Sequence, residues 1–545
     1  QPQGFDAFGL PAENYAIKHG IHPAESTEKN ISTMRKQLKA IGALYNWDKE
    51  VVTCNKDYYK WTQWLFLELY KNNLAYRKEA LVNWDPVDQT VLANEQVLSD
   101  GTSERSGAEV IQKPLKQWFL KITNYADELL NFDELNWPSK TVMMQKNWIG
   151  RSEGANIAFV VHGTDLSLDV FTTRPDTLFG ATYMVISPEH PIVDILNLKE
   201  DNDILVYCNN AKKKSELQRT DLEKDKTGIF TGYYAVNPIN NKRIKIWIAD
   251  YVLINYGTGA IMAVPGHDQR DFDFAKKYEL DIVKVVDCNN ISIENEAYTE
   301  DGVAVNSEFL NGMKTKDAKE EMYKYLEEKN LGSRTKTYRL KDWLISRQRY
   351  WGTPIPIVYD PEGNSHPIPE EYLPWVLPDD VEYKPKGTSP LGSSKELVER
   401  TEKIFGVGWR PEIDTMDTFM CSSWYYLRYP DSINPHEAFS EKSLKWLPVD
   451  YYIGGSEHAT MHLLYARFIT KALRDLKYLN FNEPFVNLYH QGTITKDGTK
   501  MSKSKGNTVA PDEFVDMYGS DTFRCYLMFM GPFDEGGDWN DKGIT

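Results

Sequence analysis

The sequence predicts an α/β protein in which a parallel sheet flanked by helices is interrupted by a β-rich insertion. Gly454 and Gly455 follow an apolar strand and run into a helix, which lets the backbone approach a nucleotide closely at the carboxyl edge of a parallel sheet. From residue 151 to about residue 335 the pattern changes to short alternating segments with many turn residues, such as 168–171 and 244–248. After residue 335 the first pattern resumes. The insertion therefore divides the sheet-and-helix domain into two parts.

Size and charge limit the class of protein. A chain of 545 residues exceeds one hydrophobic core and predicts about three or four domains. No apolar run approaches the roughly 18 residues that cross a bilayer, so no membrane partner is expected. A net charge of −16 argues against binding nucleic acid by bulk attraction, so RNA contacts would need local basic surfaces, such as 113–121 or 334–349.

The cysteines favour a reducing compartment. All five are scattered along the chain, and no two form a C-x-x-C pair. Neither a disulfide framework nor a zinc site is therefore predicted, and cytoplasm-like surroundings fit best.

Residues 1–150, the first part of the host domain, combine helices with one polar loop residue. Apolar residues recur at helical spacing over 31–41 and 61–69, which predicts two helices that pack into the core. Asp6 lies in a loop punctuated by glycine and proline, where its carboxylate could meet a ligand's ammonium group or form an Asx-type turn. Local sequence leaves both interpretations open.

The insertion carries two polar constellations. The first follows a predicted strand and comprises Thr172, Thr173, Arg174 and Thr177; the second opens a predicted helix and comprises His267, Asp268 and Asp271. Such groups can build a hydrolytic pocket for an aminoacyl ester, because a carboxylate neutralises the α-ammonium and hydroxyls position water and ribose. Taken singly, they are also typical of a helix N-cap and of strand ends.

In the second part of the host domain, aromatic residues surround the glycine turn. Phe419, Tyr425 and Tyr452 could wall an apolar side-chain pocket. His458 and His462 lie one helical turn apart, a spacing that also suits zinc, but the sequence offers no convincing third ligand.

A basic segment, Lys500-Met501-Ser502-Lys503-Ser504, lies between Gly498 and Gly506. Two lysines spaced by small hydroxyl residues and flanked by glycines indicate a mobile cationic loop that suits a polyphosphate. The alternative is a solvated basic turn.

This pentapeptide resembles the signature loop of class I aminoacyl-tRNA synthetases, and the ordered motifs of the chain are most similar to bacterial-type leucyl-tRNA synthetases. The resemblance implies a Rossmann-like, doubly wound catalytic domain split by an inserted editing domain. It also implies ATP-dependent ligation of leucine to tRNA(Leu) through leucyl-adenylate, and hydrolysis of mischarged tRNA. Mg²⁺ would accompany ATP, and a monomer in the cytoplasm is expected.

The same resemblance assigns roles to individual residues. Lys500 and Lys503 would be catalytic. Leucine would contact Asp6, Phe419, Ser422, Tyr425, Tyr452, His458 and His462. ATP would contact Gly454, Gly455, Glu457, His458, Gln491, Lys500, Met501, Ser502, Lys503 and Ser504. In editing, Asp271 would hold the α-amino group, Thr177 would exclude leucine, and Thr172, Thr173, Arg174, His267 and Asp268 would complete the site.

The chain also departs from the family pattern. The cysteines of a small zinc module expected near 84–115 are absent, as are two further clusters near 359–363 and 407–410, so no zinc is expected. An H-x-G-H segment is also missing and would precede Gln1, while only the start of a helical anticodon-binding domain is expected, at 511–545, after the second catalytic part at 336–510. Alone, the chain is therefore expected to activate leucine poorly, although its editing domain can still fold.

Other functions are open. An editing-only hydrolase would not need the lysine loop, and a non-catalytic RNA-binding protein would tolerate its loss. Within the family, isoleucyl- and valyl-tRNA synthetases are the nearest alternatives.

Overall fold

The computed structural model describes two compact units. It describes residues 1–92, 96–98, 100–104, 106–211, 219, 226–254, 258–288, 292–382, 388–501 and 506–545. The first unit contains Gln1–Leu98, Thr102–Ile149 and Leu340–Thr545, and Gly150–Arg339 make up nearly all of the second. The sequence prediction placed the inserted domain at 151–335. In the described residues no helix has the length and apolar character needed to cross a membrane.

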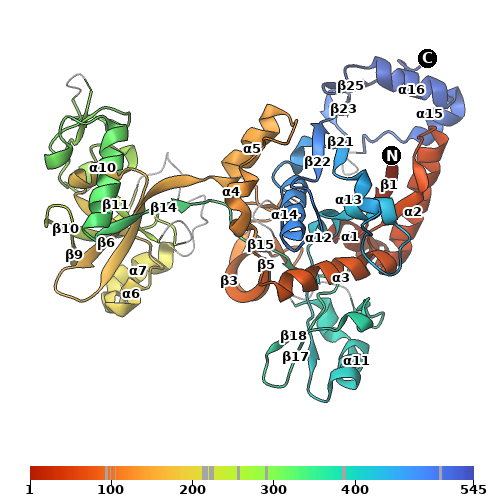
Figure 1. Cartoon of the computed structure of the whole chain (residues 1–545), viewed down its shortest axis with the longest axis horizontal. Helices are drawn as coiled ribbons and strands as arrows, with labels where there is room; N and C mark the ends of the chain where they lie inside the picture. The colour runs from red at the N-terminus through yellow and green to blue at the C-terminus, as the bar shows by residue number, and fades with distance from the viewer. Residues whose placement is uncertain are drawn as a thin grey trace. The chain divides into compact units, whose positions relative to one another are not determined.

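The first part of unit 1 begins with a parallel strand pair covered by helices (Figure 1). Its elements are β1 (Pro2–Phe5), α1 (Leu10–His19), α2 (Pro23–Ala40), β2 (Asn46–Val52), α3 (Lys56–Lys71), β3 (Ala75–Asp85), β4 (Thr90–Leu92), β5 (Ile111–Leu120), α4 (Ala126–Leu129) and α5 (Ser139–Ile149). The two helices predicted from apolar spacing are α2 and α3. Leu65 and Leu69 of α3 are fully buried, as the spacing indicates, whereas Met34 of α2 is half exposed.

The second part of unit 1 returns to a parallel pair and ends in two helices and a strand, β25 (Gly536–Trp539), where the sequence predicts the start of a helical domain at 511–545. Its elements are β15 (Trp343–Leu344), β16 (Ser346–Arg347), β17 (Ile357–Tyr359), β18 (Ser365–Pro367), α11 (Lys395–Phe405), β19 (Arg410–Pro411), β20 (Thr415–Met416), α12 (Thr418–Ser422), α13 (Tyr425–Arg428), β21 (Val449–Ile453), α14 (His462–Asp475), β22 (Phe485–Tyr489), β23 (Thr493–Lys496), β24 (Thr499–Lys500), α15 (Pro511–Tyr518), α16 (Ser520–Phe529) and β25 (Gly536–Trp539). The parallel pairs β1–β2 and β21–β22, together with the flanking helices, confirm the predicted α/β fold.

The segment resembling a zinc module is held by hydrogen bonds. It runs from the end of β3 through β4 to the start of β5, and these strands belong to an antiparallel sheet of order β15-β5-β3-β4. Asp85 accepts hydrogen bonds from the backbone N–H groups of Val87 and Asp88 and from the Ser106 hydroxyl, at 2.9, 3.0 and 2.6 Å. A carboxylate and hydroxyls thus fix a turn for which the family pattern predicts thiolates.

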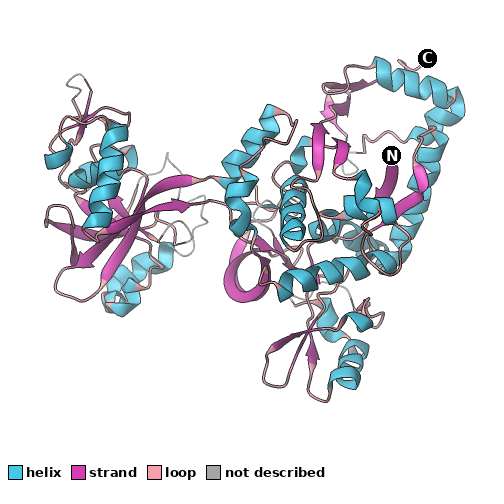
Figure 2. Ribbon diagram, viewed as in Figure 1, coloured by secondary structure: helices cyan, strands magenta, loops and turns pink. Residues whose placement is uncertain are grey.

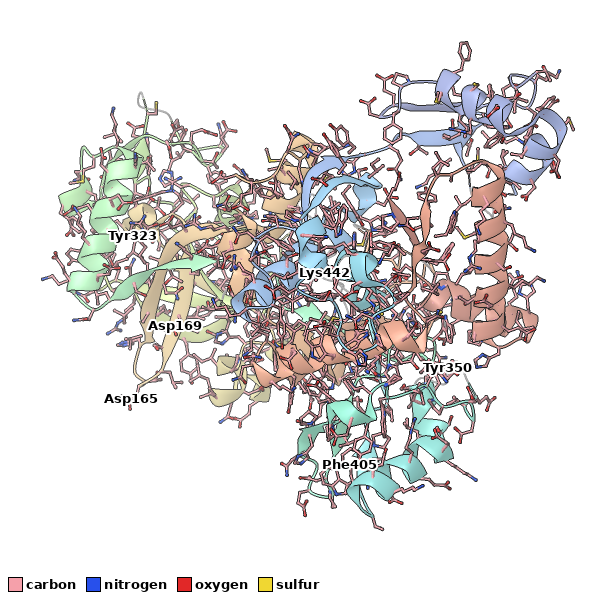
Figure 3. All side chains as sticks on the ribbon, turned by 45° about the vertical axis from the view of Figure 1, so that its right-hand side comes forward. Asp165, Asp169, Tyr323, Tyr350, Phe405 and Lys442 are labelled. Atoms are coloured by element: carbon pink, nitrogen blue, oxygen red, sulfur yellow. The ribbon has the colours of Figure 1, made fainter. Side chains whose placement is uncertain are left out.

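A second small module, built from β17, β18, β19 and α11, is closed by a histidine–carboxylate hydrogen bond and by stacked rings. His366 lies 2.9 Å from Asp360, and this contact holds the pKa of Asp360 at about 2. Phe405, at the end of α11 (Figure 3), stacks on Trp409 with centroids 5.5 Å apart. These contacts lie where the two further cysteine clusters were expected.

Unit 2 is organised around a seven-stranded mixed sheet, with helices beside it (Figure 2). The strand order is β11-β8-β10-β9-β6-β14, and β7 pairs with β6. Its elements are β6 (Ser152–Val161), β7 (Ser167–Thr172), β8 (Tyr183–Ile186), α6 (Ile192–Ile195), α7 (Asn202–Ala211), β9 (Gly228–Val236), β10 (Arg243–Ala249), β11 (Ala260–Ala263), α9 (Gln269–Lys277), β12 (Val286–Asp287), β13 (Val303–Ala304), α10 (Thr315–Glu328) and β14 (Gly332–Thr337). Both strands predicted from alternation are present, as β7 and β10.

Helix α14 is anchored in unit 1 by a buried cation. Arg467 is fully buried, and its guanidinium donates two hydrogen bonds of 2.8 Å to the Glu483 carboxylate. It also donates to the Leu129 carbonyl at 2.7 Å and to Gln145 at 2.8 Å. Since a buried charge without a partner is costly, this side chain ties α14 to α4 and α5.

Arg467→Met should therefore destabilise unit 1 by about 3–5 kcal/mol, because it leaves the buried Glu483 carboxylate with Lys471 as its remaining donor and leaves two buried acceptors without theirs. Urea unfolding followed by tryptophan fluorescence measures the change. Arg474→Met is the matched control in the same helix, because the ion pair between Arg474 and Glu128 is solvent-exposed and is worth roughly 1 kcal/mol or less. Equal effects of the two substitutions would contradict the anchoring role.

Candidate functional site

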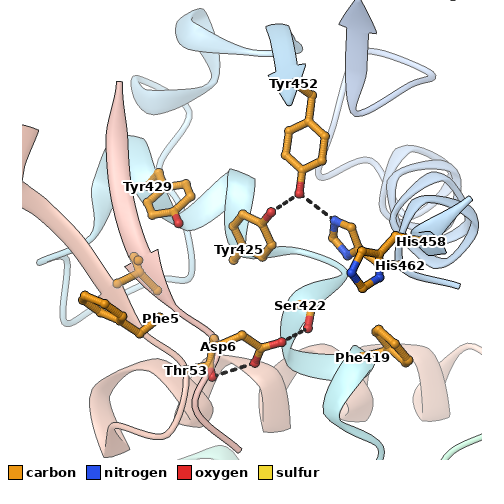
Figure 4. Close-up of a pocket in the computed structure, with 12 residues that line it drawn as sticks. Phe5, Asp6, Thr53, Phe419, Ser422, Tyr425, Tyr429, Tyr452, His458 and His462 are labelled. Atoms are coloured by element: carbon orange, nitrogen blue, oxygen red, sulfur yellow. Dashed lines mark hydrogen bonds between the residues drawn. The ribbon is translucent and has the colours of Figure 1, made fainter. Parts of the chain in front are cut away.

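A pocket of about 230 Å³ opens in unit 1 at the carboxyl ends of β1 and β2 (Figure 4). It is lined by Gly4, Phe5, Asp6, Val51, Thr53, Phe419, Ser422, Tyr425, Tyr429, Tyr452, His458 and His462. The volume is below the roughly 300–1,000 Å³ of drug-sized ligand sites. The pocket therefore suits one small molecule with an apolar part.

Asp6 supplies the charge in this pocket. It follows the last residue of β1, and its carboxylate accepts hydrogen bonds from Thr53 at 3.0 Å and from Ser422 at 2.5 Å. Burial raises the pKa of Asp6, against the effect of these two hydrogen bonds. The carboxylate thus binds two side chains rather than the backbone of its own turn, so the Asx-turn alternative is wrong.

Aromatic rings form the opposite wall. The hydroxyl groups of Tyr425 and Tyr452 are hydrogen-bonded, and the Tyr452 hydroxyl lies 2.7 Å from Nε2 of His462 (Figure 4). Burial lowers the pKa of His462 to about 3, so its imidazole is neutral. Neutral rings and hydroxyls make this wall suitable for an uncharged side chain.

The wall residue Phe419 and the Asp6 partner Ser422 are carried by α12, which a buried ion pair fixes in place. Asp417 caps the helix by accepting a hydrogen bond from the N–H of Phe419 at 3.3 Å. Arg347, which is 2% exposed, donates to the other Asp417 oxygen at 2.6 Å. Sequence reasoning missed this pair, and it also missed Thr53, whose position directly after β2 was the available signal.

The glycine turn follows the second parallel pair. Ile453 and Tyr489 are register partners at the ends of β21 and β22, so Gly454 and Gln491 come from neighbouring strand ends. His490 bridges the two, with Nδ1 lying 2.7 Å from the Gly454 carbonyl. Glu457 and Gln491 are exposed beside this turn.

The basic segment begins on a hairpin. Lys500 is exposed at the end of β24, and Met501 packs against the apolar cluster around Trp539. Ser502, Lys503 and Ser504 lie outside the described residues.

In unit 2 the first polar constellation follows β7. Thr172 accepts a hydrogen bond from the N–H of Arg174 at 3.0 Å, and the Thr177 hydroxyl donates to the Arg174 carbonyl at 2.8 Å. The Arg174 guanidinium pairs with Asp176 at 2.9 Å. Thr173 is exposed beside them.

The second constellation surrounds the start of α9. Asp268 is the N-cap, accepting from the N–H groups of Arg270 and Asp271 at 2.9 and 3.2 Å, so the capping interpretation applies to Asp268. Asp271 is buried, and its carboxylate accepts one backbone hydrogen bond, from Val264 at 2.8 Å. Burial and the charge of Asp268 raise the pKa of Asp271 to about 8.

His267 links the two constellations. Its Nδ1 lies 2.7 Å from the Tyr298 carbonyl, and its Nε2 accepts from the N–H groups of Val285 and Val286 at 2.8 and 3.0 Å. Burial lowers the pKa of His267, and the charges of Arg174 and Asp176 act on it in opposite directions. With both ring nitrogens bonded to backbone, His267 shapes the site.

The described residues hold no group of three or more His, Cys, Asp and Glu side chains arranged for a metal ion. His458 and His462 therefore have no third ligand in the part of the chain that the structure describes.

Two family models match the chain. The model of the leucyl-tRNA synthetase editing domain matches residues 146–327, and the model of class I tRNA synthetases for isoleucine, leucine, methionine and valine matches residues 18–157 and 305–537. A leucine--tRNA ligase of Clostridium tetani is 57% identical over the whole of this chain, and one of Clostridium perfringens is 56% identical. The chain belongs to the leucyl-tRNA synthetase family.

A solved leucyl-tRNA synthetase supports the same assignment. The LeuRS–tRNA–LeuAMS ternary complex of Agrobacterium radiobacter K84 matches all of this chain with a TM-score of 0.86 and 41% identity. The chain covers 67% of each Clostridium relative and 66% of the Agrobacterium protein. These relatives favour the leucyl over the isoleucyl and valyl alternatives, and the editing-domain match includes both polar constellations of unit 2.

The buried carboxylate of this leucyl-tRNA synthetase editing domain should make stability depend on pH. The folded-state pKa of Asp271 is about 8 and its ordinary value is 3.8, so the folded domain binds a proton that the unfolded chain releases. This contribution is complete below about pH 4 and is lost as pH rises to about 8. Asp271→Asn should flatten the fall in melting temperature measured by calorimetry across that range.

Asp273→Asn is the control for this measurement, because Asp273 is an exposed carboxylate in the same helix. A pH profile that Asp271→Asn leaves unchanged would contradict the assignment of the proton to Asp271.

Proposed function

We propose that this chain carries the leucine-binding and phosphate-binding parts of leucine--tRNA ligation, together with a hydrolytic site that edits mischarged tRNA(Leu). The main support is Asp6, a buried carboxylate facing a small pocket with neutral aromatic walls. A free amino acid with an apolar side chain has the matching chemistry, because its ammonium group and its hydrocarbon part need opposite surroundings.

Leucine would bind with its ammonium group at Asp6. The cation would replace water that the buried carboxylate has lost, and so would lower the pKa that burial raises. Its side chain would lie against Phe419, Tyr425 and His462. Tyr452 and Ser422 would keep their neighbours in place through the hydrogen bonds described above.

Activation joins leucine to ATP. The leucine carboxylate attacks the α-phosphate, a carboxylate–phosphorus bond forms, the α–β phosphoanhydride breaks, and pyrophosphate leaves. The turn at Gly454 and Gly455, with Glu457, His458 and Gln491, would hold the nucleotide. Lys500 and Lys503, with the neighbouring Met501, Ser502 and Ser504, would bind the phosphates and balance the charge that develops on them. ATP would enter as its magnesium complex, with the ion held through phosphate oxygens.

In the second step, the terminal ribose hydroxyl of tRNA(Leu) attacks the carbonyl carbon of leucyl-adenylate, and AMP leaves. The Agrobacterium relative was solved with tRNA and LeuAMS, which supports the same ligands for this chain. Five free cysteines fit a reducing, cytoplasmic compartment.

Editing removes amino acids that resemble leucine. One methylene gives a binding pocket only about 1–3 kcal/mol of discrimination, so a second, hydrolytic site is needed. Asp271 would hold the α-ammonium of the misattached amino acid. Thr172, Thr173 and Arg174 would contact the reacting ester, which water cleaves to a free amino acid and tRNA. Thr177 would keep leucine from the hydrolysable position, and His267 and Asp268 would complete the site.

The leading alternative is a hydrolase that only edits. An intact pocket around Asp6 and a lysine hairpin speak against it, since an editing enzyme uses neither. A non-catalytic RNA-binding role is disfavoured by the same residues.

Two substitutions separate the activities. Asp6→Asn should lower leucine-dependent ATP–pyrophosphate exchange by about a hundredfold or more, because a buried hydrogen-bonded charge pair is worth about 3–5 kcal/mol. It should leave hydrolysis of mischarged tRNA(Leu) unchanged. Asp271→Ala should have the opposite effect. Both assays are run with leucine, isoleucine, valine and methionine, on this chain and on a version extended at both ends to the length of its relatives.

Exchange with leucine in the extended enzyme, sensitive to Asp6→Asn, is the expected result. Silence in both versions with all four amino acids, with hydrolysis retained, would support the editing-only alternative instead.

A further inference from the structure

The lysine segment is attached to a hairpin with a tightly defined turn. Strands β23 and β24 are antiparallel, and Thr495 is the register partner of Lys500. Two residues, Asp497 and Gly498, connect β23 to β24. Their φ angles are 54° and 68°, and positive φ at both positions is typical of the type I′ turn of a two-residue hairpin loop. An isolated two-stranded hairpin is only marginally stable in water, so this one needs external support.

A third strand supplies that support. β25 runs parallel to β23, with Thr493 opposite Gly536 and Lys496 opposite Trp539. The approach is close near Gly492, where a Cβ atom would lie 2.0 Å from the backbone nitrogen of Gly536. Any side chain at residue 492 would push the strands apart.

One carboxylate oxygen on β25 holds both the strand and the turn. Oδ1 of Asp538 accepts a hydrogen bond from the Thr495 hydroxyl at 2.5 Å and from the Gly498 N–H at 2.9 Å. These two bonds lower the pKa of Asp538, so it stays ionised. Thr495 faces Lys500 across the hairpin, so Asp538 fixes the residue opposite the lysine and the turn that leads to it.

Contacts beyond Lys500 complete the base of the segment. The Asn507 side chain donates to the Lys500 carbonyl at 3.3 Å. Met501 packs in the apolar cluster that includes the buried ring of Trp539, the residue after Asp538. The backbone of Lys500 is thus held against β25 on both sides, through the hairpin turn before it and through Met501 after it.

We propose that Asp538 is a positioning residue for leucine activation: through Thr495 and Gly498 it sets where Lys500 meets the phosphates of ATP. This inference rests on the proposed role of Lys500 in leucine activation. Asp538 touches no substrate, and its effect passes through the hairpin. Because it is exposed, its removal leaves the core intact.

The test compares Asp538→Ala with two other substitutions in the extended enzyme. Asp538→Asn keeps an acceptor oxygen, so its kcat should be much closer to that of the unmodified enzyme than the kcat of Asp538→Ala. Asp541→Ala is the matched control: Asp541 is an exposed carboxylate that pairs with Lys496 of the same hairpin at 3.2 Å and accepts from the Trp539 indole N–H at 2.7 Å, whereas Thr495 and the turn are held by Asp538.

Asp538→Ala should lower kcat of ATP–pyrophosphate exchange by about tenfold to a hundredfold, the scale of loss from misplacing a catalytic group by about 1 Å. The KM for leucine and the hydrolysis of mischarged tRNA should not change. Asp541→Ala should stay within about twofold of the unmodified enzyme. Equal effects of the two alanine substitutions, or a parallel loss of leucine binding and editing, would overturn the proposal.

Hydrogen exchange gives a readout that does not require catalysis. In this chain, amides of peptide 493–501 should exchange at least about tenfold faster with Asp538→Ala than with Asp541→Ala, since a lost support raises local opening. Equal exchange would overturn the positioning role. An extended enzyme that exchanges no pyrophosphate with leucine would instead count against the proposed function, and hydrogen exchange would still decide this inference.

Discussion

Burial of the Asp6 carboxylate is the constraint on which the pocket of unit 1 depends. A charge removed from water needs replacement donors, and the fold brings them from two distant segments, Thr53 after β2 and Ser422 at the end of α12. That requirement extends outward, because Ser422 is in place only if α12 is. Arg347 and Asp417 hold α12 by a second buried charge contact. The position of the pocket wall thus depends on two buried carboxylates, Asp6 and Asp417, and on the groups that donate hydrogen bonds to them.

Unit 2 also contains a buried carboxylate, but this one accepts its hydrogen bond from the backbone. Asp271 is also buried, but its donor is one backbone N–H, and a neighbouring carboxylate raises its pKa further. A carboxylate with so few donors gains much from a cationic ligand. In both units, therefore, burial destabilises the charged form of a carboxylate. A cationic ligand, such as an ammonium group, would relieve that destabilisation.

The sequence predicts best those elements that depend on residues close to one another in the chain. The glycine turn, helices α2 and α3, strands β7 and β10, and the start of α9 follow from short-range patterns, and the structure has them. What the sequence left open depended on distant partners. Whether Asp6 meets a ligand or closes a turn was undecidable because Thr53 and Ser422 lie 47 and 416 residues away. Asp268 and Asp271 looked alike in sequence, and only the fold makes one a helix cap and the other a buried carboxylate. The sequence predicts a basic surface over 334–349, but Arg347 within it is buried against Asp417, and no local pattern reveals that pairing.

The turn held by Asp85 and Ser106 has a physiological consequence. Zinc modules depend on thiolates, which peroxide oxidises and chelators deprive of metal. The hydrogen bonds among Asp85, Val87, Asp88 and Ser106 join oxygen and nitrogen atoms, and the sequence places no cysteine between Cys54 and Cys208. The turn that these bonds hold is consequently built without a metal ion or a thiolate, whereas a thiolate-bound counterpart would lose its structure on oxidation or chelation.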